Sequence, residues 1–312
     1  MAELTDEARI QAGKSQMLQY LNNQYIGWHV MAIESIRKIV LNADSFYTDI
    51  LEKKELTNVC TEENINKELR NGWMYEAVSH AEQAIEDLFS LLKKAQRIDY
   101  FARDVVQYNA TEIKKYIWDF HIDDLKYITE QFHVPYFDIE EDMEWENKEC
   151  FEAYKTALLL MKEYLKELVR FHRHYYQDYC QYKHGLAVSL RRPVEGINPL
   201  DGALWTFDTS TVEKKWKREG VAPSIIMDLT PETQPYVRSL HDEKNLLHYS
   251  IHPVNLEEIL AATKKAVVLL NVLRINLMSI SETAEDCEIA EYAFPCEKDD
   301  LLTVVTIGFP RG

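Results

Sequence analysis

The chain has 312 residues, of which 46% are hydrophobic and 28% are charged, and this composition excludes an intrinsically disordered protein. Its formal net charge of −17 excludes a surface that is basic throughout, although it is compatible with a local basic groove that binds nucleic acid. The five cysteines include no CxxC pair, which argues against a zinc knuckle and favours free thiols in a reducing compartment.

The first part of the chain is predicted to form long helices. Apolar residues recur at helical spacing up to about residue 57, and a second helix with Thr61 as its N-cap continues to about Ala95. His80 is the one strongly polar member of the apolar stripe on this second helix. We interpret it either as a hydrogen-bonded core histidine or as part of a site.

Two shorter helical segments and an acidic run follow. Residues 100–120 have an aromatic, helical pattern with Asn109 as an internal cap, and a short helix over residues 123–132 ends before Pro135. The acidic run at residues 138–149 lacks the glycine at which a calcium-binding loop would turn. We interpret it as the solvated entrance of the next helix, where acids favour the positive end of the helix dipole.

The longest helix is predicted between Cys150 and Gly185, and it ends on a basic last turn and a glycine suited to a left-handed cap. Its stripe residues are separated by steps of three and four, which indicates a helix packed along its whole length. One of them is His172, which would approach His80 if the two long helices pack together. The stripe consists of Phe151, Tyr154, Leu158, Met161, Leu165, Leu168, His172, Tyr175, Tyr179 and Tyr182.

After this helix the pattern changes to short β-prone runs bounded by turn residues. One long helix, at about residues 255–280, lies between the last two runs. The sequence therefore predicts a mainly α protein: a bundle of long antiparallel helices over residues 1–185, and a smaller α/β portion over residues 186–312 whose helix packs on the bundle. The predicted strands are Leu186–Leu190, Ala203–Phe207, Ser224–Leu229, Leu246–Ile251 and Leu301–Ile307.

The N-terminal residues and the longest apolar run indicate where in the cell the protein is expected. The N-terminal residues are acidic and polar, unlike a secretory signal peptide. The longest apolar run, at residues 266–273, is interrupted by Asn271 and is too short to span a bilayer. We therefore expect a cytoplasmic protein that does not enter a membrane.

The chain lacks the motifs of several large enzyme classes. It contains no GxSxG elbow, no phosphate-cradling glycine loop and no GxGxxG fingerprint, which argues against α/β-hydrolases, NTPases and Rossmann enzymes. His241, His248 and His252 form a cluster in which the last two face the same way on a strand, so a metal-dependent hydrolase stays open. Otherwise we expect neither a metal nor a cofactor.

Two basic patches stand out against the acidic background. Cations interleaved with aromatic residues bind phosphate and stack on bases. The same residue types also complement a helix C-terminus and fill the edge of a core, so a structural role is equally open. The predicted binding residues are Arg170, Lys183, Arg191 and Arg192 in the first patch, and Lys214, Lys215, Trp216 and Lys217 in the second.

Two features of the helical part resemble the HEPN superfamily, helical-bundle proteins common in bacterial defence and toxin–antitoxin loci. One is the amphipathic segment at residues 73–89, with its small residues and acidic face. The other is Tyr182-Lys-His-Gly185, which is similar to the helix-terminal His-Gly of several HEPN-like families. The resemblance covers residues 1–185 and the helix at 255–280. It implies RNA cleavage by an arginine and a histidine spaced Arg-x4–6-His, often across a dimer, but no arginine of this chain has a histidine at that spacing.

These observations predict a cytosolic, non-enzymatic binding or interaction protein that is HEPN-like and linked to bacterial stress or phage defence. RNA and a partner protein are its candidate ligands, and a homodimer is a further option. The alternative is a metal-independent ribonuclease, with histidine as the general base and arginine stabilising charge on phosphate. Its candidate catalytic residues are His184, His172, Arg173 and Tyr179.

Overall fold

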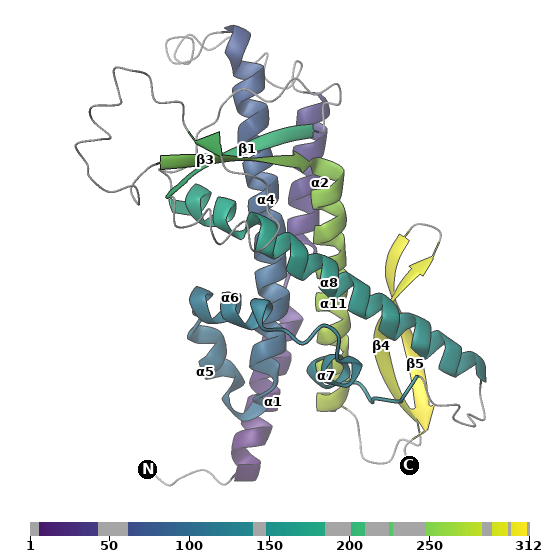
Figure 1. Ribbon diagram of the computed structural model, residues 1–312. Coiled ribbons are helices and arrows are strands. Elements are labelled where there is room, and N and C mark those ends of the chain that lie inside the picture. The colour runs from purple at the N-terminus through teal and green to yellow at the C-terminus, as the bar shows by residue number, and fades with distance from the viewer. Residues whose placement is uncertain are drawn as a thin grey trace, which may run out of the picture. The chain divides into compact units, whose positions relative to one another are not determined.

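The computed structural model describes residues 6–42, 62–139, 148–184, 201–209, 225–226, 247–282, 289–298 and 301–310 (Figure 1). In this part the protein is mainly α-helical, with a smaller C-terminal portion in which strands accompany one long helix, so the predicted fold class is confirmed. None of the described helices is both long enough and apolar enough to cross a membrane.

The long helices lie where the apolar periodicity predicts them. The helices are α1 (Asp6–Asn23), α2 (Trp28–Leu41), α4 (Glu62–Ala95), α5 (Phe101–Val106), α6 (Ala110–Trp118), α7 (Leu125–Gln131), α8 (Lys148–His184) and α11 (Leu256–Glu282), with a 3-10 turn, η1, at Ile98–Tyr100. The first predicted helix is divided into α1 and α2 by a break at residues 24–27. Asn255 caps α11, because its side-chain Oδ1 accepts hydrogen bonds of 2.9 and 3.1 Å from the backbone N–H groups of Glu257 and Glu258.

The segment predicted as one helix over residues 100–120 is interrupted at residues 107–109. Asn109 caps α6 as predicted, since its Oδ1 accepts hydrogen bonds of 3.0 and 3.3 Å from two backbone N–H groups of that helix. The interruption lets the chain turn after α4 and return beside it. A hydrogen bond of 3.1 Å from the Tyr108 hydroxyl to the carboxylate of Glu86 joins the two segments.

The strands form two antiparallel sheets. They are β1 (Asp201–Thr209), β2 (Ile225–Ile226), β3 (Leu247–Asn255), β4 (Ile289–Lys298) and β5 (Leu301–Pro310). β3 pairs with both β1 and β2, and β4 pairs with β5. The sequence predicts no strand at β4, whose Pro295 lacks an N–H group and weakens the strand pattern. A two-stranded sheet consists of edge strands, where proline is tolerated. The predicted strand at residues 186–190 lies outside the described residues.

The chain folds into two compact units, each built from separate stretches of sequence. Unit 1 comprises Met1–Val30, Gln83–Phe171 and Ala262–Gly312, and unit 2 comprises Met31–Glu82 and His172–Ala261. The division falls within α2, α4, α8 and α11, so each of these helices contributes residues to both units. The predicted boundary after the longest helix stays a prediction.

Unit 1 has a hydrophobic core to which α1, α4, α8, α11 and the β4–β5 hairpin all contribute. The ring of Tyr154 on α8 packs edge-on against Phe294 of β4 and Phe309 of β5, with centroid distances of 5.6 and 5.7 Å. Asn276 ties α11 to β4, because its side chain donates to the Ala293 carbonyl at 3.1 Å and accepts from the Ala293 N–H at 2.7 Å. These contacts attach the C-terminal hairpin to the helical core.

Unit 2 combines the three-stranded sheet, in the order β1-β3-β2, with parts of α2, α4, α8 and α11. The buried residues Ile33, Ile36 and Val40 of α2 are spaced three and four apart, which places them on one face of that helix. On the same helix, Arg37 donates a hydrogen bond of 2.6 Å from Nε to Glu257 of α11. Apolar packing and one ion pair thus hold α2 within this unit.

Candidate functional site

The predicted catalytic residues of α8 all belong to unit 2, and the three whose side chains the structure describes do not share one surface. His172 and Tyr179 are buried, with 0% and 4% of their surface exposed, whereas Arg173 is exposed. Successive residues of an α-helix are rotated by about 100°, so the side chains of His172 and Arg173 leave the helix in different directions. The side chain of His184 lies outside the described part of the chain.

The imidazole of His172 contacts a buried carboxylate. Its Nδ1 lies 2.6 Å from Oε2 of Glu82 on α4, and both side chains are fully buried. At this distance the ring either carries the positive charge of an ion pair or donates one N–H as a neutral imidazole, and both forms give the carboxylate a donor. The ring of Tyr176 packs against the imidazole, with centroids 4.7 Å apart.

The contact with Glu82 also shows which side of α4 faces His172. Glu82 follows His80 by two residues, and residues two apart point to opposite sides of a helix. His80 itself is half-buried. The stripe predicted through His80 therefore does not mark the side of α4 that bonds to His172.

The seam between α4 and α8 continues with tyrosines and acids. Tyr182 stacks on Tyr75, with ring centroids 5.1 Å apart, and donates a hydrogen bond of 2.5 Å to Oε1 of Glu76. His172 contacts Glu82, and Tyr182, which comes later on α8, contacts Tyr75, which comes earlier on α4. The two helices are therefore antiparallel. Burial, together with the neighbouring Glu76, raises the pKa of Tyr182, and burial with the nearby Asp178 raises that of Tyr175. These hydroxyls therefore stay protonated at neutral pH.

A histidine oriented by a carboxylate is the arrangement found in general-base catalysis. In this seam, however, both ring nitrogens of His172 lie in the interior, since Nε2 is buried as well as Nδ1. A general base must lie within hydrogen-bond reach of the proton that it removes from a substrate. The His172–Glu82 pair therefore suits the pairing of two helices better than the cleavage of RNA.

The predicted binding residues that the structure describes are exposed cations on α8. Arg170 is exposed, and Lys183 lies over the ring of Tyr179 at 5.4 Å, with its Nζ 3.5 Å from the tyrosine hydroxyl. A lysine in this position also complements the C-terminus of the helix. The other predicted binding residues lie outside the described part: Arg191, Arg192, Lys214, Lys215, Trp216 and Lys217.

The histidine cluster of the second half is described only through its backbone. In the register of the sheet, position 252 of β3 lies opposite Leu204 of β1, and position 248 lies opposite Asp208. His241 and the side chains of His248 and His252 lie outside the described part of the chain. The metal site predicted from these three histidines stays a prediction.

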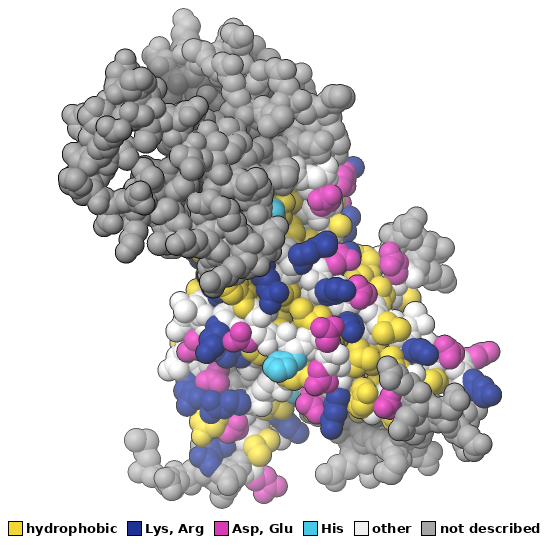
Figure 2. All heavy atoms as spheres, viewed as in Figure 1, with side chains coloured by type: hydrophobic (Ala, Val, Ile, Leu, Met, Phe, Trp, Pro, Cys, Tyr) yellow, Lys and Arg dark blue, Asp and Glu magenta, His cyan; other side chains and the backbone are white. Residues whose placement is uncertain are grey.

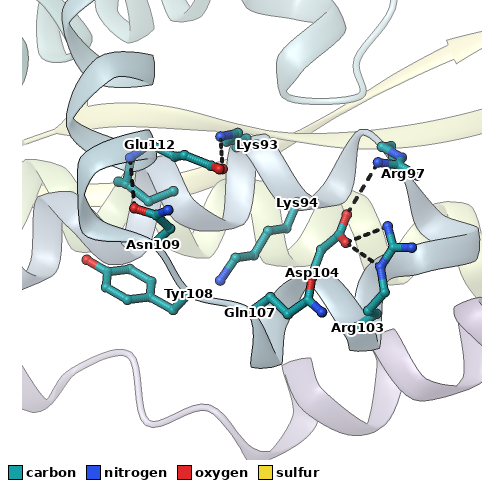
Figure 3. Close-up of a pocket in the computed structure, with 10 residues that line it drawn as sticks. Lys93, Lys94, Arg97, Arg103, Asp104, Gln107, Tyr108, Asn109 and Glu112 are labelled. Atoms are coloured by element: carbon teal, nitrogen blue, oxygen red, sulfur yellow. Dashed lines mark hydrogen bonds and ion pairs between the residues drawn. The ribbon is translucent and has the colours of Figure 1, made fainter.

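The structure also contains a cationic cleft in unit 1 that hydrophobic periodicity does not predict (Figure 3). It lies where the end of α4, the helix α5 and the start of α6 meet. Its volume is about 560 Å³, within the roughly 300–1,000 Å³ of small-molecule sites. In Figure 2, Lys and Arg side chains gather over α5 and α6, interspersed with acidic ones. The charged residues of the cleft are Lys93, Lys94, Arg97, Arg103, Asp104 and Glu112.

Three of the four cations contact carboxylates of the cleft. Lys93 donates a hydrogen bond of 2.9 Å to Glu112. Arg103 donates from Nε and Nη2 to one oxygen of Asp104 at 3.1 and 3.0 Å, and Nη1 of Arg97 lies 4.0 Å from the other oxygen. Asp104 thus lies between two guanidinium groups.

Lys94 differs from its neighbours. Among the described residues its ammonium makes no ion pair, and its Nζ lies 5.4 Å from the ring centroid of Tyr108, within the range of a cation–π contact. In Figure 3 its side chain extends into the cleft between Tyr108 and Gln107. Burial lowers the pKa of Lys94, and the adjacent Lys93 acts in the same direction, whereas the negative charges of Asp87 and Asp104 oppose this shift.

The sequence does carry a signal for the cleft, namely four cations within residues 93–103 of a strongly acidic chain. These cations lie on both sides of a helix end. Only the turn through η1 and α5 brings Arg103 back to the end of α4, so helical periodicity alone does not group them.

Comparison of the chain with models of protein families, with curated proteins and with solved structures finds no match. Candidate functions therefore rest on the residues and their geometry.

Proposed function

We propose that this is a non-enzymatic binding protein, which holds a ligand or partner without cleaving it. The observation that supports the proposal most is the full burial of His172 against Glu82. A nuclease histidine needs at least one ring nitrogen at the surface, where it exchanges a proton with the ribose or the leaving group. In this protein the imidazole is instead used to pair α8 with α4.

The position of Arg173 supports the same proposal. An arginine that stabilises charge on phosphate in the transition state has to converge with the histidine on one phosphate group. Arg173 is exposed on α8, next in sequence to a histidine that points inward. This arrangement supports a binding role over a joint catalytic site of the two side chains.

We also propose that the protein is related to the HEPN superfamily, acts in bacterial stress or phage defence, lies in the cytoplasm and forms a homodimer. RNA and a partner protein also stay candidate ligands. The alternative that uses His241, His248 and His252 predicts zinc or manganese in stoichiometric amounts, which elemental analysis of the purified protein would detect.

An RNA cleavage assay tests the proposal. The purified protein would be incubated with mixed RNA, with and without magnesium or manganese, alongside the variants Arg173→Ala and His184→Ala. We expect no cleavage by any of the three proteins. Cleavage by the parent protein that is lost in both variants would contradict the proposal and support the ribonuclease alternative. Lys166→Ala is a matched control, since it removes an exposed cation of the same helix that belongs to none of the predicted sites.

A further inference from the structure

We propose that the cationic cleft formed by α4, α5 and α6 binds a small organic phosphate that carries at least two negative charges. This inference deepens the proposed function, on which it rests, by naming a ligand class and the residues that contact it. The charge of the cleft is the first argument. Its four cations exceed its two carboxylates, which leaves a surplus of two positive charges in a chain with a net charge of −17.

Lys94 supplies the second argument. Because its ammonium is partly removed from water and makes no ion pair among the described residues, with Asp87 and Asp104 attracting it only from a longer distance, an anion in the cleft would replace solvation that the side chain has lost. The contact with Tyr108 holds the amine in place at 5.4 Å from the ring centroid. Figure 3 shows this amine between Tyr108 and Gln107, among the residues that line the cleft.

The two arginines supply the third argument. Both guanidinium groups lie over the ring of Tyr100, at 4.5 Å for Arg97 and 4.3 Å for Arg103, and both approach Asp104. These contacts favour certain orientations of the two half-exposed groups before a ligand arrives. Each guanidinium has five N–H donors, so donors remain beyond those that face Asp104. A guanidinium is well suited to the oxygens of a phosphate group.

The size of the cleft and the charges around it favour a small molecule over RNA. A volume of about 560 Å³ holds a phosphate group with an organic part attached to it. Amide groups of Gln107 and Asn109 line the cleft and offer hydrogen bonds to that organic part. An RNA strand would extend beyond the cleft over a protein with a net charge of −17, which repels the remaining phosphates.

Asp104 has a separate role in this proposal, because it competes with the ligand for the two arginines. It neutralises part of their charge when the cleft is empty and so excludes anions with a single charge, such as acetate. A phosphomonoester or diphosphate has enough charge to compete with it. The loss of this carboxylate should therefore strengthen anion binding, whereas the loss of Lys94 should weaken it.

Isothermal titration of the full chain tests the inference, with inorganic pyrophosphate, adenosine diphosphate, acetate and a short single-stranded RNA as probes. We expect pyrophosphate and the nucleotide to bind and acetate not to bind. Lys94→Ala should weaken pyrophosphate binding about ten-fold or more, the usual effect of removing one charged hydrogen-bond partner. Asp104→Asn should strengthen it several-fold. Lys115→Ala removes an exposed lysine of α6 outside the cleft, and it should leave the affinity unchanged.

The opposite signs expected for Lys94→Ala and Asp104→Asn separate a binding site from general damage to the fold, since a misfolded variant does not gain affinity. Comparing the two phosphate probes shows whether the organic part contributes. The inference is overturned if neither phosphate probe binds, if Lys115→Ala weakens binding as much as Lys94→Ala, or if the RNA binds more tightly than both. RNA cleavage in the assay above would instead contradict the proposed function, whatever the titration shows.

Discussion

His172 and Glu82 show how two titratable groups are kept inside a pair of helices. Burying either charge alone is costly, and the cost is offset only when the partner is close and well oriented. Their distance of 2.6 Å meets this condition. The pair therefore adds specificity to the way in which α8 meets α4, because a shifted register would separate the two groups.

A double-mutant cycle measures this coupling. His172→Phe alone should lower the free energy of unfolding by about 2–4 kcal/mol, because it leaves the Glu82 carboxylate buried without its described donor. Adding Glu82→Met should recover part of that loss, since two apolar side chains then face each other. The measurement is chemical denaturation of the four proteins. Additive effects of the two substitutions would show that the groups are not coupled.

Tyr154 predicts how stability changes in alkaline solution. Its hydroxyl donates to the carbonyl of Pro135 and accepts from the N–H of Phe137, both at 3.1 Å, and burial raises its pKa to about 12. In the unfolded chain a tyrosine titrates near about pH 10. The stability that this group contributes is therefore fully present below about pH 10 and is lost as the pH rises towards 12.

Tyr154→Phe should have two effects that denaturation at several pH values can separate. Near neutral pH the lost hydrogen bonds should lower the free energy of unfolding by about 1–2 kcal/mol. Above about pH 10 the variant should lose stability less steeply than the parent protein, because the titrating group is gone. The exposed Tyr25→Phe is the control. A parent protein and Tyr154→Phe variant with the same slope above pH 10 would contradict the assignment.

At the residue scale, the sequence predicts which positions are buried more accurately than it predicts which groups those positions contact. The spacing of apolar residues correctly placed His172 in a core stripe. It did not predict Glu82, because an acidic residue is assigned to the solvent side of a helix unless its buried partner is known. The cleft around Lys94 depends on a turn of the chain, which hydrophobic periodicity does not describe.

Among the elements, α1 packs closely against η1, and this contact constrains the residue at position 13. A Cβ added to Gly13 would lie 2.1 Å from the carbonyl oxygen of Ile98, much closer than two such atoms can approach. Glycine is therefore required at this position by space and not by backbone conformation. α1 would have to move away from η1 to accept any other residue.

Two glycine-to-alanine substitutions should change stability in opposite directions. Gly13→Ala should lower the free energy of unfolding by about 1–3 kcal/mol, through the collision with η1. Gly72→Ala in α4 should raise it by up to about 1 kcal/mol, because its Cβ meets nothing within 4 Å and alanine favours the helix. Thermal denaturation checks both. If both substitutions raised the free energy of unfolding by a similar amount, helix propensity alone would decide the outcome at residue 13.

Element boundaries were predicted well where a side chain marks them. Asn109 and Asn255 are helix caps as their positions suggest, because the bonds that they make lie within three residues of the chain. The sequence pattern does not predict β4, for the opposite reason. Its stability depends on pairing with β5 and on the bonds between Asn276 and Ala293, which are 17 residues apart.

On the scale of the whole molecule, the pattern of apolar residues correctly predicts a mainly α protein, but the total charge does not reveal a local excess of positive charge. A net charge of −17 describes the average surface, and the cleft of unit 1 departs from that average. Binding of a compact anion is compatible with such a chain because the field of a few close cations exceeds that of distant carboxylates within a Debye length, about 8 Å at physiological salt. A strongly negative total charge therefore argues more strongly against the binding of extended polyanions than against the binding of small anions.

The core of unit 1 has a consequence for how the gene can be divided. Leu269 and Leu273 of α11 and Phe294 of the hairpin belong to the same core as Leu158 and Leu165 of α8. A gene fragment that stops after residue 185 would encode only one side of that core, and the remaining fragment would encode the other. Because each polypeptide carries an apolar face that is complementary to the other, we expect the two to associate when they are expressed together, as the halves of a split protein do.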